Sequence, residues 1–145
     1  MWVGGTWILG YVVVPMLFEV LPDRQLAGRV AGQLFSSLAY IGIACALYLL
    51  AYQLQQFGRD ALRRSRFFVI VGMLLLVLVG QFVLQPIIAG LKTQALPLDV
   101  MQSALAAQFK TWHAVSATLY LMQSLLGIVL VVETRRQSLH RYSIW

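Results

Sequence analysis

Residues 67–91 read FFVIVGMLLLVLVGQFVLQPIIAGL, a run of 25 residues without a charged side chain. An α-helix rises about 1.5 Å per residue, so about 20 apolar residues cross the hydrocarbon core of a bilayer. Three further apolar stretches have comparable lengths, at about residues 2–21, 30–53 and 112–132. The sequence therefore predicts an all-α, polytopic membrane protein. Residues 1–145 would form one four-transmembrane-helix bundle that ends in a short basic tail, 133–145.

The composition agrees with a chain that is solvated by lipid. Hydrophobic residues make up 60% of the 145 residues and the mean hydropathy is +0.78, well above the values of soluble domains. The net charge of +6 is carried mainly by basic residues beside the apolar stretches, which speaks against nucleic-acid binding. The expected partner is the lipid bilayer, and a homo-oligomer or another membrane protein is a further possibility.

Positive charge is distributed unevenly between the two sides of the predicted bundle. Four arginines lie between the second and third apolar stretches and three follow the fourth, so these segments hold seven of the eleven basic residues. Loops rich in lysine and arginine remain in the cytoplasm. The sequence thus predicts a multi-pass protein of the bacterial inner (plasma) membrane with both termini in the cytoplasm.

Two features recur at a nearly constant offset. Pro15 and Pro86 lie at related places in the first and third stretches, 71 residues apart, and a Leu-Tyr-Leu triplet recurs at 47–49 and 119–121. One interpretation is a duplication that yields two parallel-related helical hairpins. The alternative is that any two hydrophobic hairpins share such features.

Local signals predict irregular helix geometry and helical extensions. Proline interrupts backbone hydrogen bonds one turn earlier, so we expect the first helix to loosen around Tyr11 and the third around Phe82. Leu26–Gly32 and Met101–Phe109 have the pattern of helical lead-ins to the second and fourth spans, the latter with Asp99 as its cap.

Polar side chains concentrate in the predicted outer half of the bundle. Such groups are costly in hydrocarbon unless they are satisfied, so we expect them to line a polar pocket that faces outward. The predicted lining residues are Tyr11, Glu19, Gln33, Ser37, Gln81, Gln85, His113 and Ser116. Gln81 and Gln85 are one turn apart, as are Gln33 and Ser37, so two facing ladders are possible. The alternative is that these groups only join helices, with Glu19 hydrated or ion-paired.

His113 is a candidate metal ligand because neutral imidazole binds copper, zinc and iron. Met16 lies at a similar predicted depth and would suit Cu(I) or a His/Met haem. Haem and copper are therefore the candidate cofactors. The alternative is that His113 is an ordinary interfacial residue beside Trp112 and Lys110.

The sequence lacks the motifs of common catalytic sites. It holds no phosphate-binding glycine-rich loop, nucleophile elbow, His-Glu-x-x-His zinc motif or Cys-x-x-Cys pair, and Cys45 is its one cysteine. The sequence favours a non-enzymatic membrane protein that binds or moves a small ligand. The alternatives are a haem- or copper-binding protein that uses His113 and a structural subunit of a membrane complex.

The first hairpin carries a family resemblance. Its characteristic segments are WVGGTW at 2–7, GYVVVPMLF at 10–18, LPDRQLAG at 21–28 and GQLF at 32–35. The chain resembles the bacterial domain of unknown function 4149, or transmembrane-protein-205-like, proteins over essentially its whole length. That resemblance implies a four-helix membrane domain without an agreed biochemical activity.

The Gly-x-x-x-x-Pro-x-x-Phe pattern of Gly10, Pro15 and Phe18 is also similar to the first helix of copper-resistance protein D and of the membrane protoporphyrinogen oxidases. Those relatives imply a metal or haem setting. The first helix of this chain holds no histidine, so the resemblance assigns no catalytic residue here.

Overall fold

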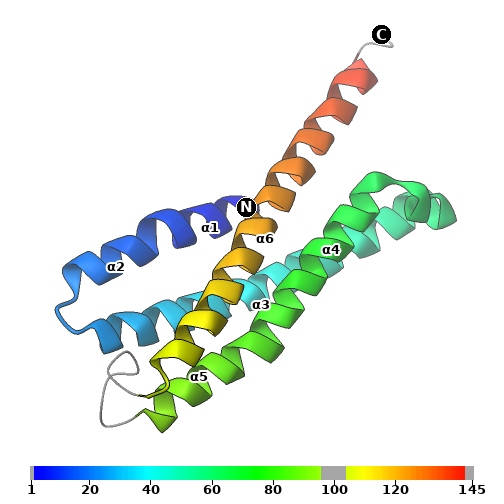
Figure 1. The fold of residues 1–145 in the computed structure, drawn as a ribbon. Helices are drawn as coiled ribbons and strands as arrows, with labels where there is room; N and C mark the ends of the chain where they lie inside the picture. Colours follow the sequence, from blue (N-terminus) through cyan, green and yellow to red (C-terminus); the bar gives the residue numbers. More distant parts are fainter. Residues whose placement is uncertain (1, 96–103, 143–145) are drawn as a thin grey trace.

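The computed structural model describes residues 2–95 and 104–142, with side chains as far as residue 133. This part of the chain is helical and contains no strand (Figure 1). Along the chain the elements are α1 (Trp2–Ile8), the π-helix η1 (Leu9–Val13), α2 (Val14–Val20), α3 (Arg24–Phe57), the 3₁₀-helix η2 (Gly58–Arg63), α4 (Ser65–Val79), the π-helix η3 (Gly80–Leu84), α5 (Gln85–Gln94) and α6 (Ala106–Tyr142).

Four helical segments of the described chain are long and apolar enough to cross a bilayer. They are Trp2–Val20, Arg24–Arg63, Ser65–Gln94 and Ala106–Glu133. In hydrocarbon a helix satisfies its backbone groups internally, so each apolar stretch becomes one helix. The all-α fold is confirmed, and four of its described helical segments have the length and composition to span a membrane.

The second helix begins earlier than its apolar stretch. Asp23 caps α3, since its Oδ1 accepts hydrogen bonds from the backbone N–H groups of Gln25 at 2.8 Å and Leu26 at 3.3 Å. The helical lead-in predicted at Leu26–Gly32 is therefore part of α3.

The fourth helix continues beyond its apolar stretch at both ends. It starts at Ala106 and runs to Tyr142, so the described part of the predicted tail is helical. The predicted cap Asp99 and the first three residues of the predicted lead-in, 101–103, lie outside the described residues.

Both prolines follow a widened helical turn. η1 precedes Pro15 and includes Tyr11, and η3 precedes Pro86 and includes Phe82. Proline lacks an N–H and its ring clashes with the carbonyl four residues earlier, so the preceding turn opens to i→i−5 hydrogen bonding. The backbone N–H that follows each segment indeed donates to the carbonyl five residues earlier. The loosening that was predicted around these two residues is confirmed.

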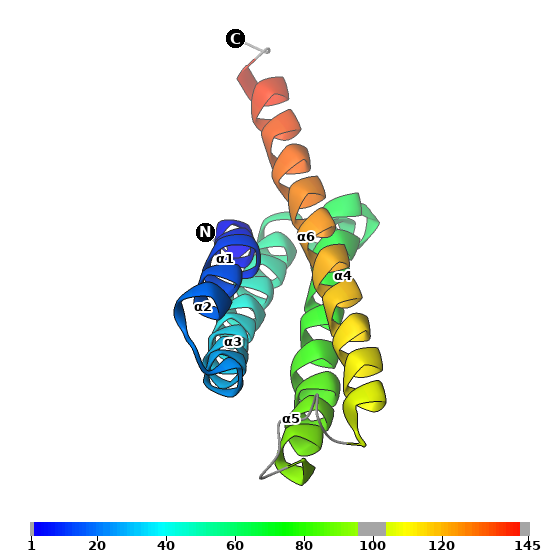
Figure 2. The ribbon, with the colours of Figure 1, turned by 60° about the vertical axis from the view of Figure 1, so that its left-hand side comes forward.

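The helices pack as two pairs. The first crossing helix lies along α3, and the third lies along α6 (Figure 2). The pairs meet where α3 packs on α4 and where α1 packs on α6. α1 starts beside α6, whereas α2 runs away from it toward the first turns of α3 (Figure 1). The end of the bundle that holds η2 is called the η2 end, and the opposite end, where α2 leads into α3, is called the α2–α3 end.

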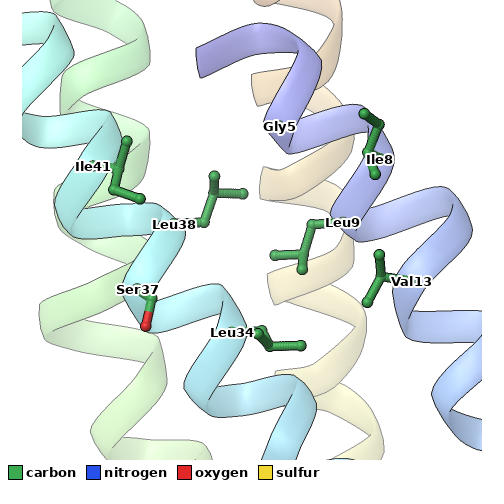
Figure 3. A pocket seen from close by; sticks show the side chains of 8 residues that line it. All are labelled: Gly5, Ile8, Leu9, Val13, Leu34, Ser37, Leu38 and Ile41. Atoms are coloured by element: carbon green, nitrogen blue, oxygen red, sulfur yellow. The ribbon is translucent and has the colours of Figure 1, made fainter. Parts of the chain in front are cut away.

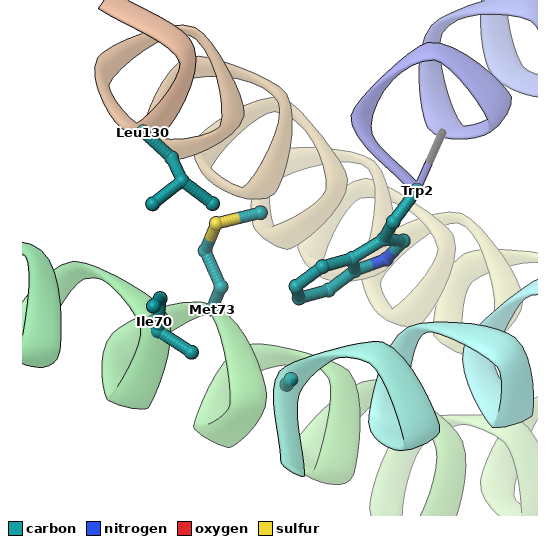
Figure 4. Packing of buried hydrophobic residues seen from close by; sticks show 5 residues of the cluster. Trp2, Ile70, Met73 and Leu130 are labelled. Atoms are coloured by element: carbon teal, nitrogen blue, oxygen red, sulfur yellow. The ribbon is translucent and has the colours of Figure 1, made fainter. Parts of the chain in front are cut away.

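The buried core lies toward the η2 end. It consists of Trp2, Ala46, Ile70, Met73 and Leu130 (Figure 4). Trp2 reaches this core because α3 offers Gly42, where a Cβ would overlap the indole ring. Gly127 of α6 likewise leaves room for Val3, whose Cγ1 would lie 2.9 Å from an added Cβ. Glycines thus let α1 approach both of its neighbours closely.

Polar contacts close the bundle at the η2 end. Ser65 Oγ donates to Glu133 Oε1 at 2.7 Å, and Arg66 Nη2 donates to the Glu133 carbonyl at 2.7 Å. The Arg64 guanidinium lies 3.6 Å from the centre of the Phe57 ring, across the connection between α3 and α4. These contacts hold the start of α4 against both α6 and the end of α3.

Candidate functional site

A line of hydrogen bonds joins α3 to η3 and α5; we call it the polar seam. Its members are Gly28, Gly32, Ser36, Gln81, Gln85 and Lys92. Gln81 Nε2 and Ser36 Oγ are 2.9 Å apart, and Ser36 Oγ also lies 3.1 Å from Gln81 Oε1. One turn along, Gln85 Nε2 donates to the Gly32 carbonyl at 3.1 Å. The acceptors on α3 are spaced by four residues, so they share one helix face.

At the α2–α3 end, the polar seam finishes at Lys92, which lies close to the ring of Phe109. Lys92 Nζ donates to the Gly28 carbonyl at 3.2 Å and lies 5.9 Å from the centre of the Phe109 ring. The Phe109 ring stacks on the imidazole of His113, with 5.7 Å between centres and an interplanar angle of 11°. The seam therefore links α3, α5 and the first turns of α6 at the α2–α3 end.

A ladder joins α3 to the third helix, but through the α3 residues that neighbour those of the ladder considered from the sequence. Gln81 and Gln85 contact Ser36 and Gly32, whereas the prediction paired them with Ser37 and Gln33. One residue corresponds to about 100° around a helix, and Gln33 and Ser37 are exposed on another side of α3.

Tyr120 joins α6 to the first helix. Its hydroxyl donates to the carbonyl of Thr6 in α1, three residues before η1 begins, and its ring packs where a Cβ at Gly10 would overlap it. The Phe35 ring meets the Tyr120 ring edge-on, with centres 5.2 Å apart, and the Tyr11 ring lies at 6.4 Å. An aromatic cluster thus fills the contact between η1, α3 and α6.

The other predicted pocket residues lie apart from one another. Glu19 is exposed on α2, and Ser116 is half-buried on α6. Among the residues whose side chains are described, Glu19, Gln33, Ser37 and Ser116 form no side-chain hydrogen bond or ion pair. The structure therefore brings Gln81 and Gln85 into the polar seam, Tyr11 beside Tyr120, and His113 against Phe109.

The two candidate metal ligands lie on helices with different neighbours. Met16 is 61% exposed on α2, which packs on α3, whereas the exposed His113 lies on α6, which packs on α5 and η3. Within the described residues no three His, Cys, Asp or Glu side chains gather in one place. Haem or copper binding at these residues stays a prediction.

Buried polar residues in the middle of the bundle were missed. Ser124 is 2% exposed and donates to the Tyr120 carbonyl at 2.9 Å, and Thr6 donates to the Trp2 carbonyl at 3.0 Å. Gln123 is 6% exposed, and its carboxamide nitrogen and oxygen have no hydrogen-bond partner among the described residues. The signal was available, because a glutamine within an apolar stretch is costly in hydrocarbon unless it is buried in protein.

Two open hollows lie on the described surface, and both are mainly apolar. The first, about 290 Å³, lies between the first helix and α3 (Figure 3). Its lining residues are Gly5, Ile8, Leu9, Val13, Leu34, Ser37, Leu38 and Ile41. The second, about 460 Å³, runs along α6 beside Thr111 and Thr118, whose hydroxyls already donate to carbonyls four residues earlier. Ser37 is the one predicted pocket residue that lines either hollow.

Comparison with known protein families identifies a match over most of the chain. A family model described as a domain of unknown function, DUF4149, matches residues 1–97, which extend from the first helix to the end of α5. No curated protein and no solved structure matches the chain. The wider resemblance to copper-resistance protein D and the membrane protoporphyrinogen oxidases stays a prediction. The match covers about two thirds of the chain, and the protein belongs to the DUF4149 family.

Proposed function

We propose that this protein is a non-enzymatic scaffold of the membrane, a four-helix subunit that acts by presenting helix faces to other membrane-embedded chains. The observation that carries the proposal is the polar seam. Gln81 and Gln85, which would be central to a polar ligand site, already form hydrogen bonds with Ser36 and the Gly32 carbonyl. A hydrogen bond between membrane helices stabilises their contact by about 0.6 kcal/mol on average and by up to about 1.7 kcal/mol.

The remaining polar groups support the same interpretation. Glu19, Gln33 and Ser37 are exposed, so they point outward from the bundle. Polar groups at membrane depth are stable where they meet water, headgroups or another protein. An outward polar face on a membrane helix fits a protein whose partners lie beside it in the bilayer.

We further propose that the protein resides in a bacterial inner membrane with the η2 end in the cytoplasm. The exposed residues Arg59 and Arg63, together with Arg64 and Arg66, gather at this end. Lysine- and arginine-rich loops remain cytoplasmic.

Cysteines introduced at Arg59 and at Lys110 test this orientation. A membrane-impermeant maleimide applied to intact cells should label only the second.

Native mass spectrometry of protein extracted from its own membranes in mild detergent tests the scaffold. The expected species is a discrete complex heavier than the monomer. A monomer that carries one polar small molecule, lost in Gln85→Leu, would contradict the proposal. Gln55→Leu, which changes an exposed glutamine in the last turn of α3, is the matched control.

A second candidate function rests on the groove between the first helix and α3. Its volume of about 290 Å³ is close to the lower limit of ligand pockets, roughly 300 Å³, and its lining favours a hydrocarbon chain. Leu38→Trp should fill the groove and reduce the amount of co-purified lipid or other apolar ligand. Leu75→Trp, at an exposed position of α4, should not. Equal ligand content in the two variants would exclude this function.

A further inference from the structure

One face of α3 carries a regular row of exposed residues; we call it the outer row. Its members are Gln33, Ser37, Tyr40, Ala44, Leu47, Ala51 and Leu54, and all seven are exposed. The intervals alternate between four and three residues, which is the spacing of a seam between two helices that pack side by side. The row runs along most of α3, on the side that the polar seam does not use.

The polar members of the outer row lie at membrane depth. Ser37 lines the groove together with Leu9 and Val13, which occupy the middle of the first membrane-crossing helix, Trp2–Val20 (Figure 3). Gln33 lies one helical turn away from Ser37, about 6 Å along the axis. Both side chains therefore lie within the depth that the first helix crosses.

These polar groups have no partner within the described part of the chain. The hydroxyls of Thr6 and Ser124 donate to carbonyls four residues earlier in their helices, but the Ser37 hydroxyl and the Gln33 carboxamide form no hydrogen bond. Each polar group that lacks a hydrogen-bond partner in hydrocarbon destabilises the protein by several kcal/mol. A protein partner that supplies donors and acceptors at this depth removes that cost.

A second exposed face of the bundle has the opposite character. Between residues 67 and 84 the exposed side chains are Phe68, Leu75, Val79, Phe82 and Val83. All of them are bulky and apolar, as expected of a surface that lipid tails cover. The polar and small residues of the outer row distinguish it from this lipid-like face.

We propose that a second copy of this chain packs along the outer row and forms a parallel, two-fold symmetric dimer in which Gln33 pairs with the partner's Gln33. A carboxamide carries both a donor and an acceptor, so it is complementary to itself. Two copies in the same membrane orientation, related by an axis along the membrane normal, bring identical residues together at equal depth. The dimer is the specific form of the scaffold proposed above and rests on that proposal.

The rest of the outer row fits close helix packing. Ser37, Ala44 and Ala51 recur every seven residues, so two α3 backbones approach closely along one side of the row. Tyr40 and Leu47 alternate with them and fill the spaces between the helices. The single polar pair near one end would set the register, as a polar residue does in a coiled coil.

Disulfide crosslinking in native membranes tests the dimer. In a Cys45→Ala background, Ala44→Cys and Ala51→Cys should give a disulfide-linked species of twice the chain mass, since a disulfide needs Cα atoms within about 7 Å. Leu75→Cys and Val79→Cys, on the lipid-like face, are the matched controls and should remain monomeric. Equal crosslinking at both faces, or no dimer from either α3 position, overturns the proposal.

The identity of the crosslinked product separates this inference from the scaffold function. A product between Ala44→Cys and a different protein would overturn self-association and leave the scaffold function supported. A protein that stays monomeric both in crosslinking and in native mass spectrometry would overturn both.

A second measurement addresses Gln33 directly. Gln33→Leu should weaken self-association in liposomes, followed by energy transfer between labelled copies, by about threefold to twentyfold, the range expected for one hydrogen bond between membrane helices. The thermal unfolding of the monomer in detergent should match the parent, because Gln33 has no intrachain partner. Gln33→Asn should retain most of the association. An association constant unchanged in Gln33→Leu overturns the pairing of the two carboxamides.

Discussion

The two π-helical segments have the same cause and different surroundings. Both η1 and η3 precede a proline, Pro15 or Pro86, that removes a backbone donor. An aromatic side chain of α6 covers η1: the Tyr120 ring packs on Gly10, and its hydroxyl donates to the Thr6 carbonyl of α1, three residues before the segment. η3 instead contacts its neighbour through a side-chain amide, because Gln81 forms a hydrogen bond with Ser36 of α3. Proline thus decides where a helix widens, and the neighbouring helices decide how the widened turn is satisfied.

The repeated Leu-Tyr-Leu triplet shows the same divergence. Tyr120 of the second triplet is half-buried against η1, whereas Tyr48 of the first is 69% exposed on α3. The corresponding tyrosines therefore make different contacts, although they lie 72 residues apart at nearly the offset of the two prolines. Descent of the two hairpins from one duplicated unit stays a prediction.

The largest difference in stability is expected between alanine substitutions at the glycines of the two π-helical segments. Gly10→Ala should lower the free energy of unfolding by about 1–3 kcal/mol, because its Cβ overlaps the Tyr120 ring. Gly80→Ala in η3 meets no atom within 4 Å, so it should be neutral or stabilising by about 0.5–1 kcal/mol. Unfolding in mixed micelles measures both. Equal losses in the two variants would show that the contact with Tyr120 is not tight.

The next effect concerns the amide contact of η3. Ser36→Ala and Gln81→Leu should each lower the free energy of unfolding by about 1 kcal/mol, since each leaves its partner without a hydrogen bond. The double variant should lose less than the sum of the two, with a coupling of about 0.6 kcal/mol or more. Strict additivity in this double-mutant cycle would mean that the two side chains do not interact in the membrane.

A smaller effect is expected from the hydroxyl that closes η1. Tyr120→Phe keeps the ring on Gly10 and removes the donor to the Thr6 carbonyl. It should therefore lower the free energy of unfolding by about 0.5–1 kcal/mol. Tyr48→Phe, in the equivalent triplet, should leave stability unchanged because that side chain is exposed. A comparable loss in both variants would argue that the tyrosines act through lipid rather than through η1.

The smallest effect is expected one residue beyond η3. Gln85→Met removes the hydrogen bond to the Gly32 carbonyl. Because that carbonyl also accepts a backbone hydrogen bond within its own helix, the free energy of unfolding should fall by only about 0.6 kcal/mol. Gln94→Met, on the same helix at an exposed position, is the control. If hydrogen exchange at Gly32 and its neighbours is the same in both variants, Gln85 contributes nothing to the polar seam.

The polar seam also shows where prediction from sequence stops. The sequence allowed facing ladders, with Gln81 and Gln85 on the third helix and Gln33 and Ser37 on the second. It paired them with Ser37 and Gln33, whereas Ser36 and Gly32 make the contacts. Apolar residues surround α3 on every side, so its sequence marks no inward face and leaves the rotation of the helix undetermined.

The aromatic closure of η1 was beyond prediction for a related reason. Tyr48 and Tyr120 have the same immediate neighbours in sequence, and only the crossing of α1 over α6 buries the second. The buried Gln123 is a different case, since its position within an apolar stretch was visible from the start. Its side chain is buried within the bundle, among residues that the sequence analysis did not consider for a polar site.

By itself the sequence determined the number of helices, their approximate extents and the two places where they widen. These properties are local, because in lipid each backbone segment satisfies its own hydrogen bonds and each proline disturbs only the turn before it. Only the tertiary structure decided which side chains meet across the helices. Lipid tails are as apolar as leucine, so no large hydrophobic term orients one helix against another. Small differences in packing at glycines such as Gly10 and Gly42, and in a few interhelical hydrogen bonds, set those rotations instead.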